Sequence, residues 1–296
     1  MNHIGGNAIL ASLWPAEGGM TRAGRAKGGL NRYAPGDGCG IDIWWLASLA
    51  SEVPIGDASS LPSFLSDREL EVFTQLRFAK RRREWLLGRW TAKRLYQRCQ
   101  KTDRAPPLRA ISVANDPDGA PYLLTDGEGR LPLSLSISHR QEHAFCALAC
   151  SSLCAVGADV ERVEIRDPAF VHDFFTPSEC ALVSRCPTPF RDTFVTILWS
   201  AKEAALKAMR IGLRADTRKV QIGRLAEFSM VPSPGRSSPD ELPGAWYQLD
   251  VSTAWERVAH IAAWCAVGGD YVYTLAIATA TTAPLGSDSP DSAPVL

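Results

Sequence analysis

The sequence predicts an α+β fold, because segments typical of helices alternate with segments typical of antiparallel strands. Two long helical patterns are evident: a basic stretch from about Lys80 to Lys101, and a run rich in Ala, Leu, Lys and Glu between Phe194 and Arg210. Strand-like apolar segments cluster between Ile111 and Glu161 and return near the C-terminus. A chain of 296 residues with 46% hydrophobic residues can bury one large core or two smaller ones.

The N-terminal region opens with residues 1 to 40, which are rich in Gly with scattered Arg and Lys and are expected to form a flexible tail. A strand is predicted from Asp42 to Leu49. The next helix is expected to open at Ser66-Asp67-Arg68-Glu69, because a Ser and a Glu three residues apart have capping-box spacing. The basic helix and the cluster of strands follow along the chain.

The C-terminal region is predicted to contain a short helix from Ser178 to Arg185, the helix rich in Lys and Glu, and strands at Val220 and from Trp246 to Val251. Its longest apolar stretch, His260 to Thr282, is interrupted by Gly268-Gly269-Asp270, which predicts a hairpin of two strands rather than a membrane span. Residues 283 to 296 are rich in Pro, Ser and Asp and are expected to form a second flexible tail.

Composition and charge favour a soluble, cytoplasmic protein. The formal net charge is zero, so no nucleic-acid partner is indicated, and the N-terminus lacks the basic segment and apolar run of a secretory signal. The cysteines include no Cys-x-x-Cys pair and no histidine at zinc spacing. We expect Cys146, Cys150 and Cys154 to be small buried hydrophobes in a strand-like region.

Two acidic motifs carry the strongest functional signal. In Gly157-Ala158-Asp159-Val160-Glu161 the preceding apolar run predicts a buried strand, where residues two apart share a face, so Asp159 and Glu161 can hold one cation together. In Trp199-Ser200-Ala201-Lys202-Glu203-Ala204-Ala205-Leu206-Lys207 the helical spacing puts Glu203 and Lys207 side by side. Taken alone, that pair is an ordinary helix salt bridge worth roughly a few tenths of a kcal/mol. Three carboxylates with a lysine suit Mg²⁺ and a phosphate, so a phosphate-handling site is the better interpretation.

Both motifs resemble, without a gap or a change at a charged position, those of the 4′-phosphopantetheinyl transferases, in particular the long, monomeric branch that serves nonribosomal peptide and polyketide synthases. Three upstream segments resemble the family in the same order along the chain: Phe78-Ala79-Lys80, Asp118-Gly119-Ala120-Pro121-Tyr122 and Leu135-Ser136-Ile137-Ser138-His139. The resemblance extends from about Ile41 to about Thr279.

The resemblance implies two similar α+β halves packed as a pseudo-dimer, with coenzyme A in the cleft between them. It places the N-terminal half at residues 41 to 151 and the C-terminal half, with the metal site, at residues 152 to 282. No internal repeat is evident in the sequence, so this duplication is expected from the resemblance alone. The family likeness also implies a monomer.

The implied reaction moves phosphopantetheine from coenzyme A to a serine of an apo carrier protein, a peptidyl or acyl carrier of nonribosomal peptide, polyketide or fatty acid synthesis, and releases adenosine 3′,5′-bisphosphate. By resemblance, Asp159, Glu161 and Glu203 hold Mg²⁺, or Mn²⁺ in its place. Glu203 is also a candidate general base, and Lys207 is expected to contact the α-phosphate and stabilise the leaving group.

The residues expected to bind coenzyme A are Lys80, Gly119, Pro121, Ser138, His139 and Lys207. Two positions depart from the family pattern. Ala120 stands where many relatives have Lys or Arg, so coenzyme A is expected to bind more weakly unless another basic residue compensates. Arg210 stands where relatives often have a glycine after the Lys/Glu helix, so the helix is expected to end differently.

Two alternatives belong to other functional classes: an inactive coenzyme A-binding homologue, and a Mg²⁺-dependent phosphodiesterase. An inactive homologue would be free to lose one of Asp159, Glu161, Glu203 or Lys207, and all four are present. A phosphodiesterase has no evident need for the Ser-His and Gly-x-Pro segments in this order. Transfer to a carrier protein is therefore the favoured interpretation.

Overall fold

The fold is described from a computed structural model, which covers residues 27–33, 41–54, 61–100, 105–149, 154–212, 215–225, 246–256 and 258–280. Its α-helices are α2 (Asp67–Gln75), α3 (Ala79–Cys99), α4 (Pro168–Phe174), α5 (Pro177–Arg185) and α6 (Thr188–Ala208). Short 3₁₀ turns occur at η1 (Ala50–Glu52), η2 (Leu108–Ala110) and η4 (Thr217–Lys219). None of these helices has the length and apolarity that crossing a lipid bilayer requires.

The strands found among the described residues form three antiparallel sheets. The first sheet has the strand order β1-β2-β7-β6 and contains β1 (Lys27–Tyr33), β2 (Ile41–Leu49), β7 (His143–Ala149) and β6 (Ser134–Arg140). The second sheet has the strand order β8-β12-β11-β10-β9 and contains β8 (Cys154–Arg162), β12 (Tyr271–Ala280), β11 (Val258–Gly268), β10 (Trp246–Thr253) and β9 (Val220–Leu225). A small third sheet joins β3 (Ile111–Asn115), β4 (Pro121–Thr125) and β5 (Gly129–Arg130). The predicted α+β class is confirmed.

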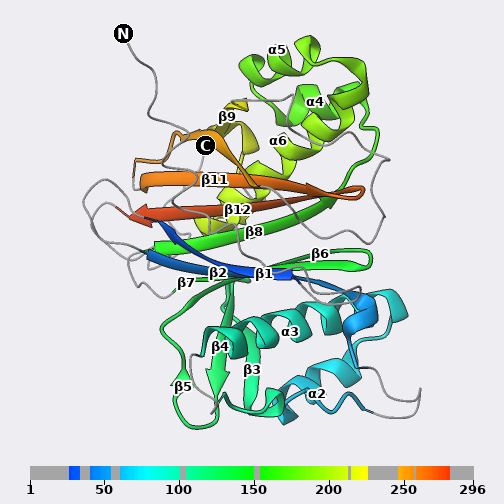
Figure 1. The fold of residues 1–296 in the computed structure, drawn as a ribbon, viewed down its shortest axis with the longest axis vertical. Helices are drawn as coiled ribbons and strands as arrows, with labels where there is room; N and C mark the ends of the chain where they lie inside the picture. The colour runs from blue at the N-terminus through cyan, green and yellow to red at the C-terminus, as the bar shows by residue number, and fades with distance from the viewer. Residues whose placement is uncertain are drawn as a thin grey trace, which may run out of the picture.

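The two large sheets stack face to face, with α3 on the outer side of one and α6 on the outer side of the other (Figure 1). Apolar side chains from both sheets fill the space between them, including Trp45 and Phe145 from the first sheet and Val156 and Tyr273 from the second. A separate core lies beneath each long helix. The β6 and β8 strands lie next to each other at the junction of the two sheets.

Most predicted elements agree with the observed helices and strands, but helix α4 was not predicted, α6 begins at Thr188 rather than near Phe194, and the N-terminus needs a correction. Lys27–Tyr33 form strand β1, paired along its whole length with β2, so the expected tail over residues 1 to 40 is wrong for this segment. Backbone pairing explains the difference. The N–H and C=O groups of an edge strand can form hydrogen bonds with a neighbouring strand even where Gly residues weaken the side-chain pattern that is typical of strands. The expected C-terminal tail and the half boundary near residue 151 lie outside the described residues.

The cysteines behave as the sequence predicts. Six cysteines lie among the described residues, and no disulfide joins any two of them. Cys146 and Cys154 are buried in strands β7 and β8, where they pack as small apolar side chains. Cys150 lies outside the described residues.

A buried ion pair ties α3 to α2 in the N-terminal half. The Lys93 ammonium group contacts the carboxylate of Glu69, and both side chains are almost fully buried. Glu69 is the capping-box residue of α2 and accepts a hydrogen bond from the backbone N–H of Ser66 at 3.1 Å. Its other oxygen accepts from the backbone N–H of Val113 at 2.9 Å. One carboxylate therefore joins two helices and a strand.

The C-terminal half repeats this arrangement. Lys202 of α6 contacts Glu179 at 2.9 Å, Glu179 caps α5 at Thr176, and its second oxygen accepts from the backbone N–H of Ile222 at 2.7 Å. The lysines lie in matching segments, Trp90-Thr91-Ala92-Lys93 and Trp199-Ser200-Ala201-Lys202. The two halves of the chain therefore share a local arrangement in which a buried Lys pairs with the capping Glu of the preceding helix.

Candidate metal and phosphate site

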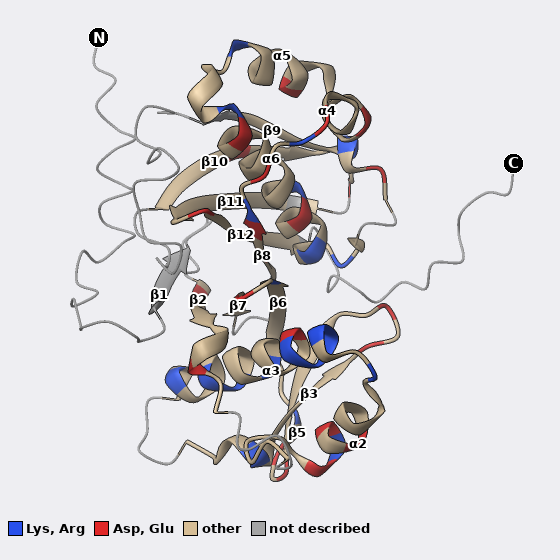
Figure 2. Ribbon diagram, turned by 90° about the vertical axis from the view of Figure 1, so that its right-hand side faces the viewer, with Lys and Arg blue, Asp and Glu red and all other residues tan. Residues whose placement is uncertain are grey.

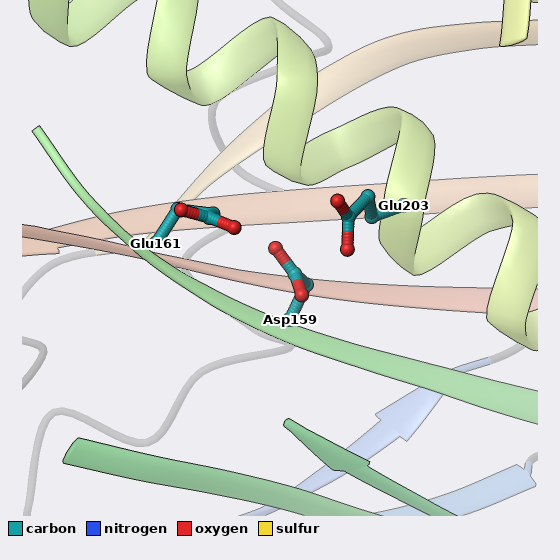
Figure 3. A group of neighbouring side chains, drawn as sticks. All are labelled: Asp159, Glu161 and Glu203. Atoms are coloured by element: carbon teal, nitrogen blue, oxygen red, sulfur yellow. The ribbon is translucent and has the colours of Figure 1, made fainter. Parts of the chain in front are cut away.

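Strand β8 and helix α6 bring the carboxylates together. Asp159 and Glu161 project from one face of β8, and Glu203 projects toward them from α6 (Figure 3). Gly157 makes this approach possible, because a Cβ atom at that position would lie 1.8 Å from the carbonyl oxygen of Ala204. The glycine of the first motif thus sets the distance between the strand and the helix.

Asp159 is the buried centre of the cluster. Its side chain is only 1% exposed. One carboxylate oxygen accepts hydrogen bonds from the Ser138 hydroxyl at 2.8 Å and from the Lys207 ammonium group at 2.7 Å. The other accepts from the Ser200 hydroxyl at 2.7 Å, and Ser200 in turn accepts from Thr274 at 2.9 Å. These donors fix the orientation of the carboxylate and offset the cost of burying its charge.

Glu161 lies at the end of β8, between two arginines. Arg140 Nε and Arg166 Nη2 approach the same Glu161 oxygen at 3.6 Å and 3.4 Å. Burial, with the nearby charge of Asp159, raises the pKa of Glu161 above its ordinary value despite these two cations. The two arginines therefore hold the Glu161 carboxylate in place.

Glu203 lies on helix α6, one turn before Lys207, and faces Asp159. Burial, and next the charge of Asp159, raise the pKa of Glu203 to about 8, and a hydrogen bond to Asp159 adds to the shift. Lys207 lies 3.9 Å from the Glu203 carboxylate and opposes the shift. At neutral pH and without a cation, a proton therefore occupies the space between two carboxylates.

Lys207 is the basic residue that contacts both Asp159 and Glu203. Its Nζ atom donates to the Ser138 hydroxyl at 3.1 Å and to the carbonyl oxygen of Ala158 at 3.2 Å, besides its contact with Asp159. Burial opposes the charge, but the carboxylates of Asp159 and Glu203 outweigh it and hold the pKa of Lys207 above its ordinary value. The side chain is still 30% exposed, so the charged end can also reach a ligand.

The three carboxylates fit a hard divalent cation. One oxygen from each of Asp159, Glu161 and Glu203 lies within 4.8 Å of the others. Two ligands on opposite sides of such a cation are about 4–5 Å apart, and Mg²⁺ takes only oxygen ligands. Burial is the largest cause of the raised pKa values of Glu161 and Glu203, and the negative charge of Asp159 adds to it, a repulsion that a bound cation would relieve.

Three serines connect β6 to β8 across the junction of the sheets. The hydroxyls of Ser134 and Ser136 accept hydrogen bonds from the backbone N–H groups of Val156 and Ala158, at 3.0 Å and 2.8 Å. Ser138, the next serine on the same side of β6, donates to Asp159. We call this row of alternate residues the serine seam. The seam provides hydrogen-bond acceptors for backbone N–H groups at the edge of β8 that faces β6, and its third serine, Ser138, contacts the acidic cluster.

A cavity of about 400 Å³ lies beside the cluster, between the two halves. The N-terminal half contributes the Asp116–Tyr122 turn and β6, and the C-terminal half contributes the start of β8 and the end of α6, including Lys207. Gly119 has a φ of +91°, a conformation that favours glycine, and this turns the chain into the wall of the cavity. The size is in the range of small-molecule binding pockets.

The structure brings most, but not all, of the predicted site residues together. Ser138 joins the acidic cluster, and Gly119 and Pro121 line the cavity with Lys207. Lys80 is exposed on the first turn of α3, lies 3.9 Å from Glu84, and is not among the residues that line the cavity. His139 lies against α3, and burial lowers its pKa. The predicted ligand contacts of Lys80 and His139 stay predictions.

Sequence reasoning missed several residues that shape the site. Ser200 and Gly157 stand inside the two motifs, so their spacing to Asp159 could have drawn attention to them. Arg140 and Arg166, which hold Glu161, carry no local signal, because their partner is defined only by the fold. Arg210 was noted as an irregularity of the helix end, and its ionic partners were not foreseen.

Fold and site together define an α+β protein in which an acidic cluster and a lysine lie beside a cavity. The sequence pattern of the 4′-phosphopantetheinyl transferase superfamily matches residues 155–276. The chain is 32% identical over 87 residues to the holo-[acyl-carrier-protein] synthase of Lactococcus lactis subsp. cremoris (strain SK11), across 28% of this chain and 73% of the relative. The chain belongs to the 4′-phosphopantetheinyl transferase superfamily, so the predicted family and enzyme class are confirmed.

A solved structure is also similar. It is a holo-(acyl-carrier-protein) synthase from Bacillus anthracis str. Ames in complex with CoA (3′,5′-ADP), 25% identical, matching 36% of this chain and 92% of that chain. The TM-score is 0.31, so the superposition is too loose to position residues of this chain.

Proposed function

We propose that this protein transfers 4′-phosphopantetheine from coenzyme A to a serine hydroxyl of an apo carrier protein and releases adenosine 3′,5′-bisphosphate. The observation that carries the proposal is the convergence of Asp159, Glu161 and Glu203 with Lys207 beside a cavity between two halves. The holo-[acyl-carrier-protein] synthase relative supports the choice of a carrier protein as acceptor. The bond formed joins the serine oxygen to the β-phosphorus, and the bond broken joins that phosphorus to the bridging oxygen.

The acidic cluster is proposed to hold Mg²⁺, or Mn²⁺, through Asp159, Glu161 and Glu203. When bound, the metal would supply a Lewis acid against the pyrophosphate oxygens. The donors around Asp159 keep its carboxylate oriented toward Glu203, and Arg140 and Arg166 hold Glu161 at the rim. The protein would thus supply carboxylates that are already held in position for the metal.

Lys207 and Glu203 are the proposed catalytic residues. The Lys207 ammonium group is fixed by Asp159 and Ser138 and remains partly exposed, so it can stabilise the negative charge that develops on the leaving bisphosphate. Glu203 is the proposed acceptor of the serine proton, because its carboxylate belongs to the acidic cluster, lies 3.9 Å from Lys207 and can accept a proton when it is ionised.

The remaining site assignments are proposals of the same kind. Gly119, Pro121 and Ser138 are proposed to contact coenzyme A from the cavity wall and the seam, and His139 and Lys80 from the α3 side. The halves over residues 41–151 and 152–282 are proposed to form a pseudo-dimer, supported by the repeated Lys–Glu pairs. We propose that the protein acts as a cytoplasmic monomer on carriers of nonribosomal peptide, polyketide or fatty acid synthesis.

Intact-protein mass spectrometry tests the proposed reaction. An apo peptidyl carrier and an apo acyl carrier are each incubated with the protein, coenzyme A and Mg²⁺, and EDTA is added in a control. A single phosphopantetheine mass gain that EDTA abolishes is the expected result, and its extent on each carrier identifies the acceptor class. No gain on either carrier while coenzyme A binds would favour an inactive binding protein, and release of phosphopantetheine without a carrier would favour a phosphodiesterase.

Protons and the cation are expected to compete at Glu203. Because the raised pKa of about 8 keeps this carboxyl protonated at lower pH, a cation must displace about one proton near pH 7. The Mg²⁺ affinity should therefore fall about tenfold for each pH unit below 8 and level off above it. Calorimetry in two buffers of different ionisation enthalpy measures the released proton. The Glu203→Gln variant should release none, and wild-type binding without proton release would contradict the expectation.

A further inference from the structure

Arg210 occupies a position that usually requires glycine. Helix α6 ends with the backbone N–H of Ile211 donating to the carbonyl of Leu206 and that of Arg210 donating to Lys207, both at 3.0 Å. This pattern is a Schellman motif, in which the residue after the C-cap is left-handed. Arg210 accordingly has a φ of +57°, a conformation that costs an L-residue about 1–2 kcal/mol. The side chain must contribute something that a glycine would not.

The guanidinium of Arg210 crosses from one half of the protein to the other. Its Nε and Nη2 atoms donate to the two oxygens of Asp118, each at 3.1 Å, and Nη2 also donates to Asp116. Both aspartates belong to the turn between β3 and β4. The hydrogen bond from Arg130, joined by that from Arg210, lowers the pKa of Asp116, so its charge is secured. Arg210 is therefore held by one edge of its planar group.

The side chain of Arg210 is 23% exposed and lines the cavity. Arg210 and Lys207 come from the same end of α6, and both line the cavity with Arg130. Among the described residues, no hydrogen bond of the Arg210 Nη1 atom is found. Three cations and two aspartates line this space, an excess of one positive charge. The turn itself offers no cation, because position 120 is alanine.

We propose that Arg210 is a phosphate-binding residue of the coenzyme A pocket, an inference that rests on the proposed function. Asp116 and Asp118 orient the guanidinium, and its Nη1 edge donates to a phosphate of coenzyme A alongside Lys207. A planar guanidinium suits this task, because it binds carboxylates on one edge while a second edge meets an anion. Arg210 thereby supplies the positive charge that Ala120 does not.

The rival explanation is that Arg210 only fastens the two halves together. Direct binding of coenzyme A, measured by calorimetry in EDTA, distinguishes the two, with Arg210→Gly and the double variant Asp116→Asn/Asp118→Asn. The glycine variant fits the left-handed backbone and removes only the side chain. The double variant breaks the same contacts between the halves but keeps the guanidinium and removes two negative charges from the pocket.

Opposite effects are expected from these variants. Arg210→Gly should weaken coenzyme A binding about tenfold or more, and Arg210→Lys should recover part of that loss. The double asparagine variant should bind coenzyme A about two- to fivefold more tightly. Wild-type affinity in Arg210→Gly, or equal weakening in both variants, would overturn the proposal.

Two further ligands identify the phosphate. If Arg210→Gly loses affinity for coenzyme A and adenosine 3′,5′-bisphosphate but not for dephospho-coenzyme A, this result assigns the contact to the 3′-phosphate. An equal loss of affinity for coenzyme A and dephospho-coenzyme A assigns the contact to the pyrophosphate. Either result supports the proposal. A wild-type protein that binds no coenzyme A would reject the proposed function itself, whereas a wild type that binds and transfers, with an unaffected Arg210→Gly, would reject only the role of Arg210.

Discussion

Replacing Asp159 with asparagine is expected to slow transfer to the carrier by at least about a hundredfold, equivalent to about 2.7 kcal/mol of transition-state stabilisation. The substitution keeps the size of the side chain but removes the charge that faces both the proposed metal and Lys207. Of the three carboxylates, Asp159 is the one that is almost fully buried and directly bonded to Lys207. Loss of its charge is therefore expected to weaken metal binding and to release Lys207, the proposed catalytic lysine, at the same time.

The Asp173→Asn variant is the matched control for this prediction. Asp173 carries the same functional group on α4, but its side chain is 65% exposed and its recorded ion-pair partner is the neighbouring His172. Carrier loading is measured by mass spectrometry under single-turnover conditions, and Mg²⁺ affinity by calorimetry. Asp173→Asn should keep the wild-type rate. If a folded Asp159→Asn protein loads the carrier at the wild-type rate, the acidic cluster is not the catalytic site.

Replacing Glu179 with alanine is expected to lower the free energy of unfolding by about 3–5 kcal/mol, the range for breaking a buried ion pair. Glu179 and Lys202 are both fully buried. The alanine variant leaves the Lys202 ammonium group without its carboxylate, although the carbonyl oxygens of Thr217 and Val220 remain as acceptors. It also removes the capping contact to Thr176 and the acceptor for the N–H of Ile222.

Urea denaturation followed by circular dichroism measures this loss. Glu71→Ala on α2 is the control, because that glutamate is exposed and its change should stay within about 0.5 kcal/mol. Glu69→Ala, which removes the corresponding carboxylate in the N-terminal half, should cost a similar amount. A loss below about 1 kcal/mol in both Glu179→Ala and Glu69→Ala would show that the buried pairs do not hold the long helices in place.

The acidic cluster could be predicted from the sequence because its geometry is mostly local. Asp159 and Glu161 are two apart on a strand, and Glu203 and Lys207 are four apart on a helix, so each pair follows from the periodicity of one element. That the pairs meet follows from Gly157, which permits the close approach of α6 to β8. Most helices and strands were likewise predicted, since their apolar patterns and caps are local.

The parts that could not be predicted depend on contacts between distant segments. The Gly-rich β1 strand forms through backbone pairing with β2, which leaves no side-chain pattern. Arg210 meets Asp116 and Asp118 only because the two halves face each other. The shared Trp-[Thr/Ser]-Ala-Lys segments are too short to indicate a repeat until Glu69 and Glu179 are seen in the same role.

The serine seam has a consequence for how the two large sheets are joined. The β6 and β8 strands each end a sheet and lie next to each other, yet they are not partners in one ladder of backbone hydrogen bonds. Because the hydroxyls of Ser134 and Ser136 accept from the buried amide groups of Val156 and Ala158, the edge of β8 that faces β6 is satisfied by side chains of β6 rather than by its backbone. Removal of either hydroxyl would therefore leave a buried N–H without this acceptor, on the strand that carries Asp159.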